Sequence, residues 1–102
     1  MADYDQAIAV YTHSAGNFVR YPKLALAYLN RGTIYADQKN YDLAIADYDK
    51  AIDLDENMAS AYQRRGDAFY AEDYAKRDVN RAKEDWQLSE YLGKKQKLRS
   101  KE

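Results

Sequence analysis

The residue types that most often serve as nucleophiles and zinc ligands are scarce in this sequence, and the histidine that could act as a base has no suitable partner. His13 is the single histidine and cysteine is absent, so neither a zinc site of these residues nor a thiol nucleophile is available. General-base catalysis by His13 would need partners that the sequence does not supply, and no serine, histidine and acid are arranged as a triad. We expect no enzymatic activity, no metal and no cofactor, and we interpret His13 as a surface or helix-end residue.

Aspartate is abundant, but its spacing does not match a metal site. A calcium-binding loop requires a glycine at a fixed position among its acidic ligands, and no such loop is present. The four glycines do not form a phosphate-binding loop either. We interpret the aspartates as solvated helix faces and helix caps. The ones considered are Asp3, Asp5, Asp47, Asp49, Asp53 and Asp55.

Composition and charge argue against several classes of partner. The formal net charge of −1 provides no attraction to nucleic acid or to an anionic membrane. The longest apolar run, Leu24 to Leu29, is far shorter than the ~20 residues of a membrane span. The first residues lack the basic start and apolar stretch of a secretory signal. We expect one domain in a cytoplasmic setting, with no nucleic acid and no membrane as partner.

The chain repeats itself with a period of 34 residues. The front halves of units 24–57 and 58–91 superpose without a gap. A back half at 41–52 has an earlier copy at 4–11 and a weaker one at 82–89. In each half the apolar residues recur at steps of three and four, which predicts helices that bury one face. The expected helices are 3–15, 24–37, 41–54, 58–71 and 76–95.

Two connecting segments differ in their turn signals. The polar stretch 37–40 predicts a tight turn, with Lys39 or Asn40 in the left-handed conformation. The stretch 71–78 has no turn residue stronger than Asp73, and helical spacing of apolar residues continues across it. It is therefore expected to form either a turn near Asp73 or a continuous helix.

These half repeats resemble the tetratricopeptide repeat, a family of stacked antiparallel helix pairs. The family's first helix carries an aromatic, a bulky residue, a glycine and a second aromatic. That pattern fits Tyr28, Arg31, Gly32 and Tyr35, and again Tyr62, Arg65, Gly66 and Phe69. The second helix's alanine and aromatic fit Ala44 and Tyr48, and its later small residue fits Ala51. The resemblance implies an all-α fold, an α-solenoid of antiparallel helix pairs with about two and a half repeats, in which the glycines allow close helix contact.

The repeat register divides the chain into four parts. Residues 1–23 are an N-terminal half repeat, with the second helix only and a loop; 24–57 are a full repeat, 58–92 a degenerate repeat and 93–102 a basic tail. The tail has five basic residues and one acid, which suits the C-terminal end of a helix. An acidic or nucleic-acid partner for the tail is the alternative.

The sequence also departs from the family pattern. Arg31 and Arg65 replace the usual leucine, and we expect their stems to pack while their charged heads reach water. The last back half is displaced by four residues relative to its predecessor. Most of the eleven tyrosines fall on structural positions of the repeat. Tyr70 does not, and it is expected either to pack or to contact a ligand.

The resemblance implies a non-catalytic scaffold for protein–protein interaction, which binds a peptide or a partner helix in a concave groove. Carried over by position, the groove residues are Leu26, Leu29, Asn30, Thr33, Asp37, Ser60, Gln63, Arg64, Asp67 and Tyr70. In chaperone-binding relatives, the positions of Asn30 and Arg64 hold a peptide's terminal carboxylate, but the lysines of that clamp are unmatched. The alternative function is self-association as a homodimer, which a continuous helix through 71–78 would allow by exchange of the last helix.

Overall fold

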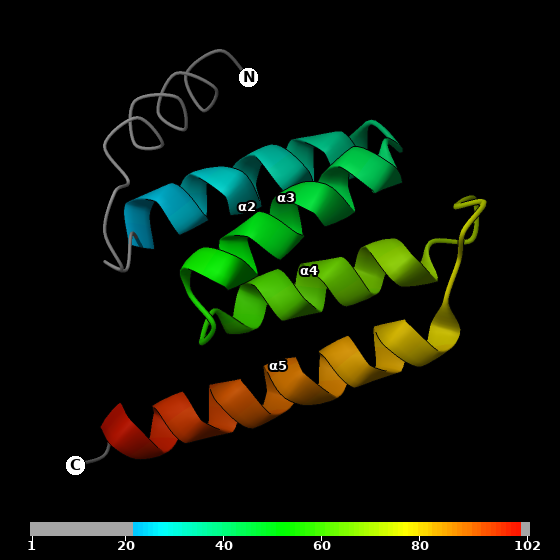
Figure 1. Ribbon diagram of the computed structural model, residues 1–102. Helices are drawn as coiled ribbons and strands as arrows, with labels where there is room; N and C mark the ends of the chain where they lie inside the picture. Colours follow the sequence, from blue (N-terminus) through cyan, green and yellow to red (C-terminus); the bar gives the residue numbers. More distant parts are fainter. Residues whose placement is uncertain (1–21, 101–102) are drawn as a thin grey trace.

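The computed structural model describes residues 22–100 and consists there of four α-helices. They are α2 (Pro22–Asp37), α3 (Tyr41–Leu54), α4 (Ala59–Tyr70) and α5 (Val79–Ser100). Figure 1 shows them side by side in chain order, as two antiparallel pairs that stack through α3 and α4. The all-α solenoid of helix pairs expected from the sequence is confirmed. The expected helix 3–15 and the half repeat 1–23 lie outside the described residues.

Helices α2, α3 and α4 begin and end within two residues of the expected positions. Pro22 is the first residue of α2, a position where the missing backbone N–H costs nothing. At the other end Lys39 adopts a φ of 62°, as predicted for the turn. The N–H groups of Lys39 and Asn40 donate to the carbonyls of Ala36 and Tyr35, which terminates α2 with a Schellman motif.

Of the two alternatives left open for 71–78, the structure forms turns around Asp73 and not a continuous helix. Helix α4 ends at Tyr70, and two successive turns follow, closed by N–H bonds from Tyr74 to Ala71 and from Arg77 to Tyr74. Asp78 then starts α5, because its side chain accepts the N–H of Arg81 at 3.1 Å. Helix α5 therefore begins three residues later than expected, and it folds back on α4 of the same chain. Within this chain the last pair is closed.

Small residues set the distance between the helices. Ala44, Ala51 and Ala82 are completely buried, and Tyr48 and Leu24 are the largest fully buried side chains. The buried cluster between the first pair and α4 is made of Leu24, Ala27, Tyr28, Leu29, Ala44, Tyr48, Ala51, Ala61 and Ala68. Burial of this apolar area on both faces of α3 holds the pairs together.

The close helix contact predicted at the two repeat glycines is confirmed. A Cβ atom on Gly32 would lie 2.8 Å from the ring of Tyr48 and 3.1 Å from the carbonyl of Ala44. On Gly66 it would meet Trp86 at 2.8 Å and the carbonyl of Ala82 at 3.0 Å. Each glycine therefore leaves room for an aromatic ring of the second helix of its pair.

Candidate functional site

One arginine–aspartate pair lies between the two helices of each repeat. Arg31 donates to both carboxylate oxygens of Asp47, from Nε at 2.8 Å and from Nη2 at 2.7 Å. Arg65 makes the same two-pronged contact with Asp85, at 2.9 and 2.8 Å. The carboxylates are 5% and 4% exposed, so both pairs are largely withdrawn from water. Such bidentate, charge-assisted bonds fix the relative orientation of the paired helices.

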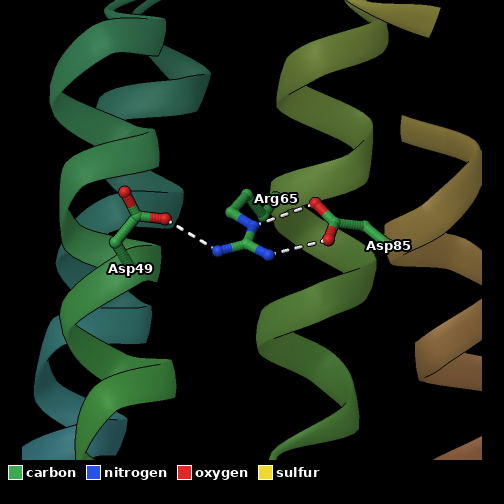
Figure 2. A network of polar contacts seen from close by, with 3 residues as sticks. All are labelled: Asp49, Arg65 and Asp85. Atoms are coloured by element: carbon green, nitrogen blue, oxygen red, sulfur yellow. Dashed lines mark hydrogen bonds and ion pairs between the residues drawn. The ribbon is translucent and has the colours of Figure 1, made fainter. Parts of the chain in front are cut away.

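Arg65 also joins the two repeats. Figure 2 shows its third nitrogen, Nη1, donating to Asp49 of α3 at 2.8 Å while the other two hold Asp85 of α5. The hydrogen bonds to Asp85 and then to Asp49 raise the pKa of the Arg65 guanidinium above its ordinary value. One cation thus connects α3, α4 and α5.

These contacts correct two expectations from the sequence. Arg31 and Arg65 do not direct their heads into water but bind aspartates, and Asp47 is buried, not part of a solvated face. The sequence contained a signal for the pairing. Each aspartate comes directly before the aromatic residue of its second helix, Asp47 before Tyr48 and Asp85 before Trp86. Asp85 and Trp86 lie four residues later than the 34-residue period places them, and loop 71–78 accommodates this displacement.

A cavity of about 250 Å³ lies among α2, α3 and α4. Its lining contains four of the predicted groove residues, Thr33 and Asp37 from α2 and Arg64 and Asp67 from α4. The other lining residues were not predicted; they are Ala36, Tyr41, Tyr48, Ala68 and Ala71. Tyr48 was assigned only to the core, where it does lie, but one edge of it also faces the cavity.

The remaining predicted groove residues do not line this cavity. Leu29 is 6% exposed and belongs to the buried cluster, so it is not accessible to a ligand. Leu26 and Tyr70 are exposed, and Asn30 is half-buried. Ser60 and Gln63 are also exposed. A clamp made by Asn30 with Arg64 is therefore not formed around this cavity.

Hydrogen bonds inside the cavity hold its polar side chains in place. The Thr33 hydroxyl donates to the carbonyl of Leu29 at 2.9 Å, and the Tyr48 hydroxyl lies 3.4 Å from the Thr33 oxygen. Burial raises the pKa of the Tyr48 phenol above its usual range. Oδ1 of Asp67 accepts from Trp86 Nε1 at 3.0 Å and from Gln63 Nε2 at 3.2 Å.

The comparisons with known proteins agree with this geometry. Residues 25–58, which cover most of α2 and all of α3, match the family model of the tetratricopeptide repeat. The chain carries a tetratricopeptide repeat. Tetratricopeptide repeats are scaffolds for protein–protein interaction and are generally non-catalytic.

Two relatives with tetratricopeptide repeats share sequence with the chain. It is 36% identical over 70 residues to the small glutamine-rich tetratricopeptide repeat-containing protein 2 of Saccharomyces cerevisiae, which covers 69% of this chain. It is 31% identical over 100 residues, or 98% of this chain, to the mouse tetratricopeptide repeat protein 12. The chain spans only 19% and 13% of the lengths of these relatives.

Loop 71–78 and the first turn of α3 bind each other reciprocally. The Tyr41 hydroxyl donates to Asp73 at 2.8 Å, and the Tyr74 hydroxyl donates to Asp42 at 2.7 Å. Lys39 and Lys76 add ion pairs to the same two aspartates. These contacts hold loop 71–78 against the start of α3 and favour the closed arrangement of the last pair.

The loop contacts shift the pKa of each partner in a consistent direction. The bond to Asp73 raises the pKa of Tyr41, while burial and the bond to Asp42 raise the pKa of Tyr74 to about 12. The same hydroxyl donors lower the pKa of Asp73 and Asp42. The bonds therefore favour a neutral phenol facing an ionised carboxylate.

Tyr70, for which packing and ligand contact were both open, is packed on two sides. Its ring lies 5.3 Å from that of Trp86, and the Arg77 guanidinium stacks over it at 4.5 Å. It remains 41% exposed.

Among residues 22–100, no three His, Cys, Asp or Glu side chains are grouped as a metal site requires, and no helix is both long and apolar enough to cross a membrane.

Proposed function

We propose that the chain binds a segment of a partner protein in a groove centred on the cavity among α2, α3 and α4. One observation supports this above the others: predicted groove residues of two successive repeats, Asp37 and Arg64 with Asp67, meet around one open space. Charged side chains at the rim and alanines at the floor suit an extended peptide, which offers both polar and apolar groups.

The test is to fill the cavity. A peptide is selected from a displayed library of unstructured peptides, and its affinity is measured by fluorescence anisotropy. Ala71 lines the cavity at the start of a loop, so Ala71→Phe places a ring there without disturbing a helix interior. Ala75→Phe is the matched control, because Ala75 is exposed in the same loop and does not line the cavity.

Ala71→Phe should weaken the peptide by about tenfold or more, which corresponds to ~1.4 kcal/mol of lost binding energy, and Ala75→Phe should not. Both variants should keep the helical circular dichroism of the unmodified chain. If Ala71→Phe binds as well as the control, the peptide does not use the cavity and the proposal is wrong.

As a second candidate we propose self-association as a homodimer. The observation in its favour is the exposed apolar surface of α5, where Leu88 and Tyr91 are 45% and 62% exposed and lie one helical turn apart. The solution mass of the chain tests it.

A further inference from the structure

The cavity has unused hydrogen-bond acceptors, and its unbonded side-chain donor among the described residues is the Arg64 guanidinium at the rim. Its hydroxyl donors are engaged, since Thr33 donates to Leu29 and Tyr41 donates to Asp73. The Tyr48 hydroxyl is directed to the Thr33 oxygen and accepts no bond from any described residue, although the side chain is 1% exposed. A buried oxygen with a free lone pair is satisfied by a ligand that donates.

The two carboxylates of the cavity also have accepting capacity. Both bonds to Asp67 end on Oδ1, which leaves Oδ2 without a donor among the described residues. The Asp37 carboxylate has no hydrogen bond or ion pair in the same part of the chain. Trp86 and Gln63 fix the orientation of Asp67, so a ligand would not bear the full entropic cost of ordering that side chain.

The size and walls of the cavity narrow the choice of ligand. A volume of about 250 Å³ is below the ~300–1,000 Å³ of small-molecule pockets but sufficient for one side chain. Ala36, Ala68 and Ala71 give the cavity an apolar wall that suits an aliphatic stem, and Tyr41 and Tyr48 supply aromatic rings of the kind that attract cations. With two carboxylates and one guanidinium, the lining carries one net negative charge.

We propose that the cavity receives the cationic side chain of a lysine or arginine carried by the bound peptide. The head group donates to Asp37, to Oδ2 of Asp67 and to the Tyr48 hydroxyl. This inference rests on the proposed function, because it names the side chain that the groove selects. The proposed ligand group is a cation, whereas the clamp suggested for Asn30 and Arg64 would bind a carboxylate. Arg64 at the rim would therefore repel the ligand's positive charge and weaken its binding.

The experiment uses blocked pentapeptides that differ only in the central residue, which is lysine, arginine, leucine or glutamate among alanines. Binding to the whole, isotopically labelled chain is followed by the amide NMR shifts of Thr33, Asp37 and Asp67. The lysine and arginine peptides should shift these amides in a saturable way, and the leucine and glutamate peptides should not.

Variants of the charged lining residues then show which sign of ligand charge the cavity binds. Asp37→Asn combined with Asp67→Asn should weaken the lysine peptide by about tenfold, because two charge-assisted bonds are lost while Trp86 keeps an oxygen to donate to. Arg64→Gln should tighten the lysine peptide, whereas it would weaken any anionic ligand. Asp53→Asn, on the exposed face of α3 and outside the cavity, is the control for loss of a surface carboxylate and should change nothing.

Three outcomes would overturn the inference. The first is that the glutamate peptide shifts the cavity amides and binds more weakly to the Arg64→Gln variant. The second is that the double aspartate change leaves the affinity for the lysine peptide unchanged. The third is that neither the lysine nor the arginine peptide shifts the cavity amides. The proposed function is tested separately by the library peptide. If that peptide stays sensitive to Ala71→Phe, groove binding stands while the cationic specificity is rejected.

Discussion

Two glycines of this chain lie inside helices but in opposite surroundings. A Cβ on Gly32 would lie 2.8 Å from the Tyr48 ring, whereas a Cβ on Gly93 of α5 would have no neighbour within 4 Å. Alanine favours a helix over glycine by ~1 kcal/mol in either place. Gly93→Ala should therefore stabilise the fold by up to ~1 kcal/mol, while Gly32→Ala should destabilise it, because the buried Tyr48 ring cannot move aside.

Gly32→Leu should be worse than Gly32→Ala, with a loss of ~1–3 kcal/mol or more from overpacking. Urea unfolding followed by circular dichroism measures all three variants on the same scale. A Gly32→Ala variant that gains as much stability as Gly93→Ala would show that the crossing of α2 and α3 is not tightly packed.

Arg31 and Arg65 show how a polar substitution enters a repeat core without an unpaired charge. Each replaces a leucine-type position, and each meets a carboxylate that is almost fully buried. Removing one member of such a pair costs more than removing both, since the other charge is left without its partner. The geometry is bidentate, so it selects one relative placement of the paired helices.

At the level of elements, the reciprocal contacts between loop 71–78 and α3 should make the stability of the fold fall at alkaline pH. The pKa of Tyr74 is raised from 10.0 to about 12, so the neutral phenol is favoured in the folded chain. A raised pKa contributes stability that is fully present below the ordinary value of 10.0 and is lost as the pH rises through about 12.

Tyr74→Phe removes this contribution, so its melting temperature should fall less steeply than that of the unmodified chain between pH 10 and about 12. Asp42→Asn should have a similar effect, because it removes the carboxylate that stabilises the neutral phenol. Thermal unfolding at a series of pH values gives the slopes. Equal slopes for Tyr74→Phe and the unmodified chain would show that this contact does not contribute.

For the molecule as a whole, we expect a dimer in solution that does not exchange its last helix. The exposed Leu88 and Tyr91 on α5 provide an apolar surface, and the closed loop 71–78 removes the route to a swap. Light scattering at increasing concentration should show a mass rising toward that of two chains. Leu88→Lys with Tyr91→Lys should reduce it to one chain, whereas Leu43→Lys, on α3 and 45% exposed, should not. A concentration-independent monomer would contradict self-association.

The helices themselves could be predicted from the amino-acid sequence, because their causes are local. Helical hydrogen bonds and burial of one face depend on residues three and four apart, and the 34-residue period repeats that pattern. The close contacts at Gly32 and Gly66 could be predicted as well, since the positions of those glycines are part of the repeat signature. The left-handed turn residue was predictable to one of two positions, Lys39 or Asn40, and it is Lys39.

Only the tertiary structure decided which side chains from different helices meet. The partner of Arg31 lies sixteen positions away and that of Arg65 twenty, so neither can be inferred from helical periodicity alone. The apolar spacing across 71–78 suits a helix, but the Asp78 cap and the Tyr74–Asp42 bond favour a loop. The cavity also depends on residues far apart in the sequence. It lies among α2, α3 and α4, and the buried alanines and arginine pairs set the spacing of these helices that leaves it open.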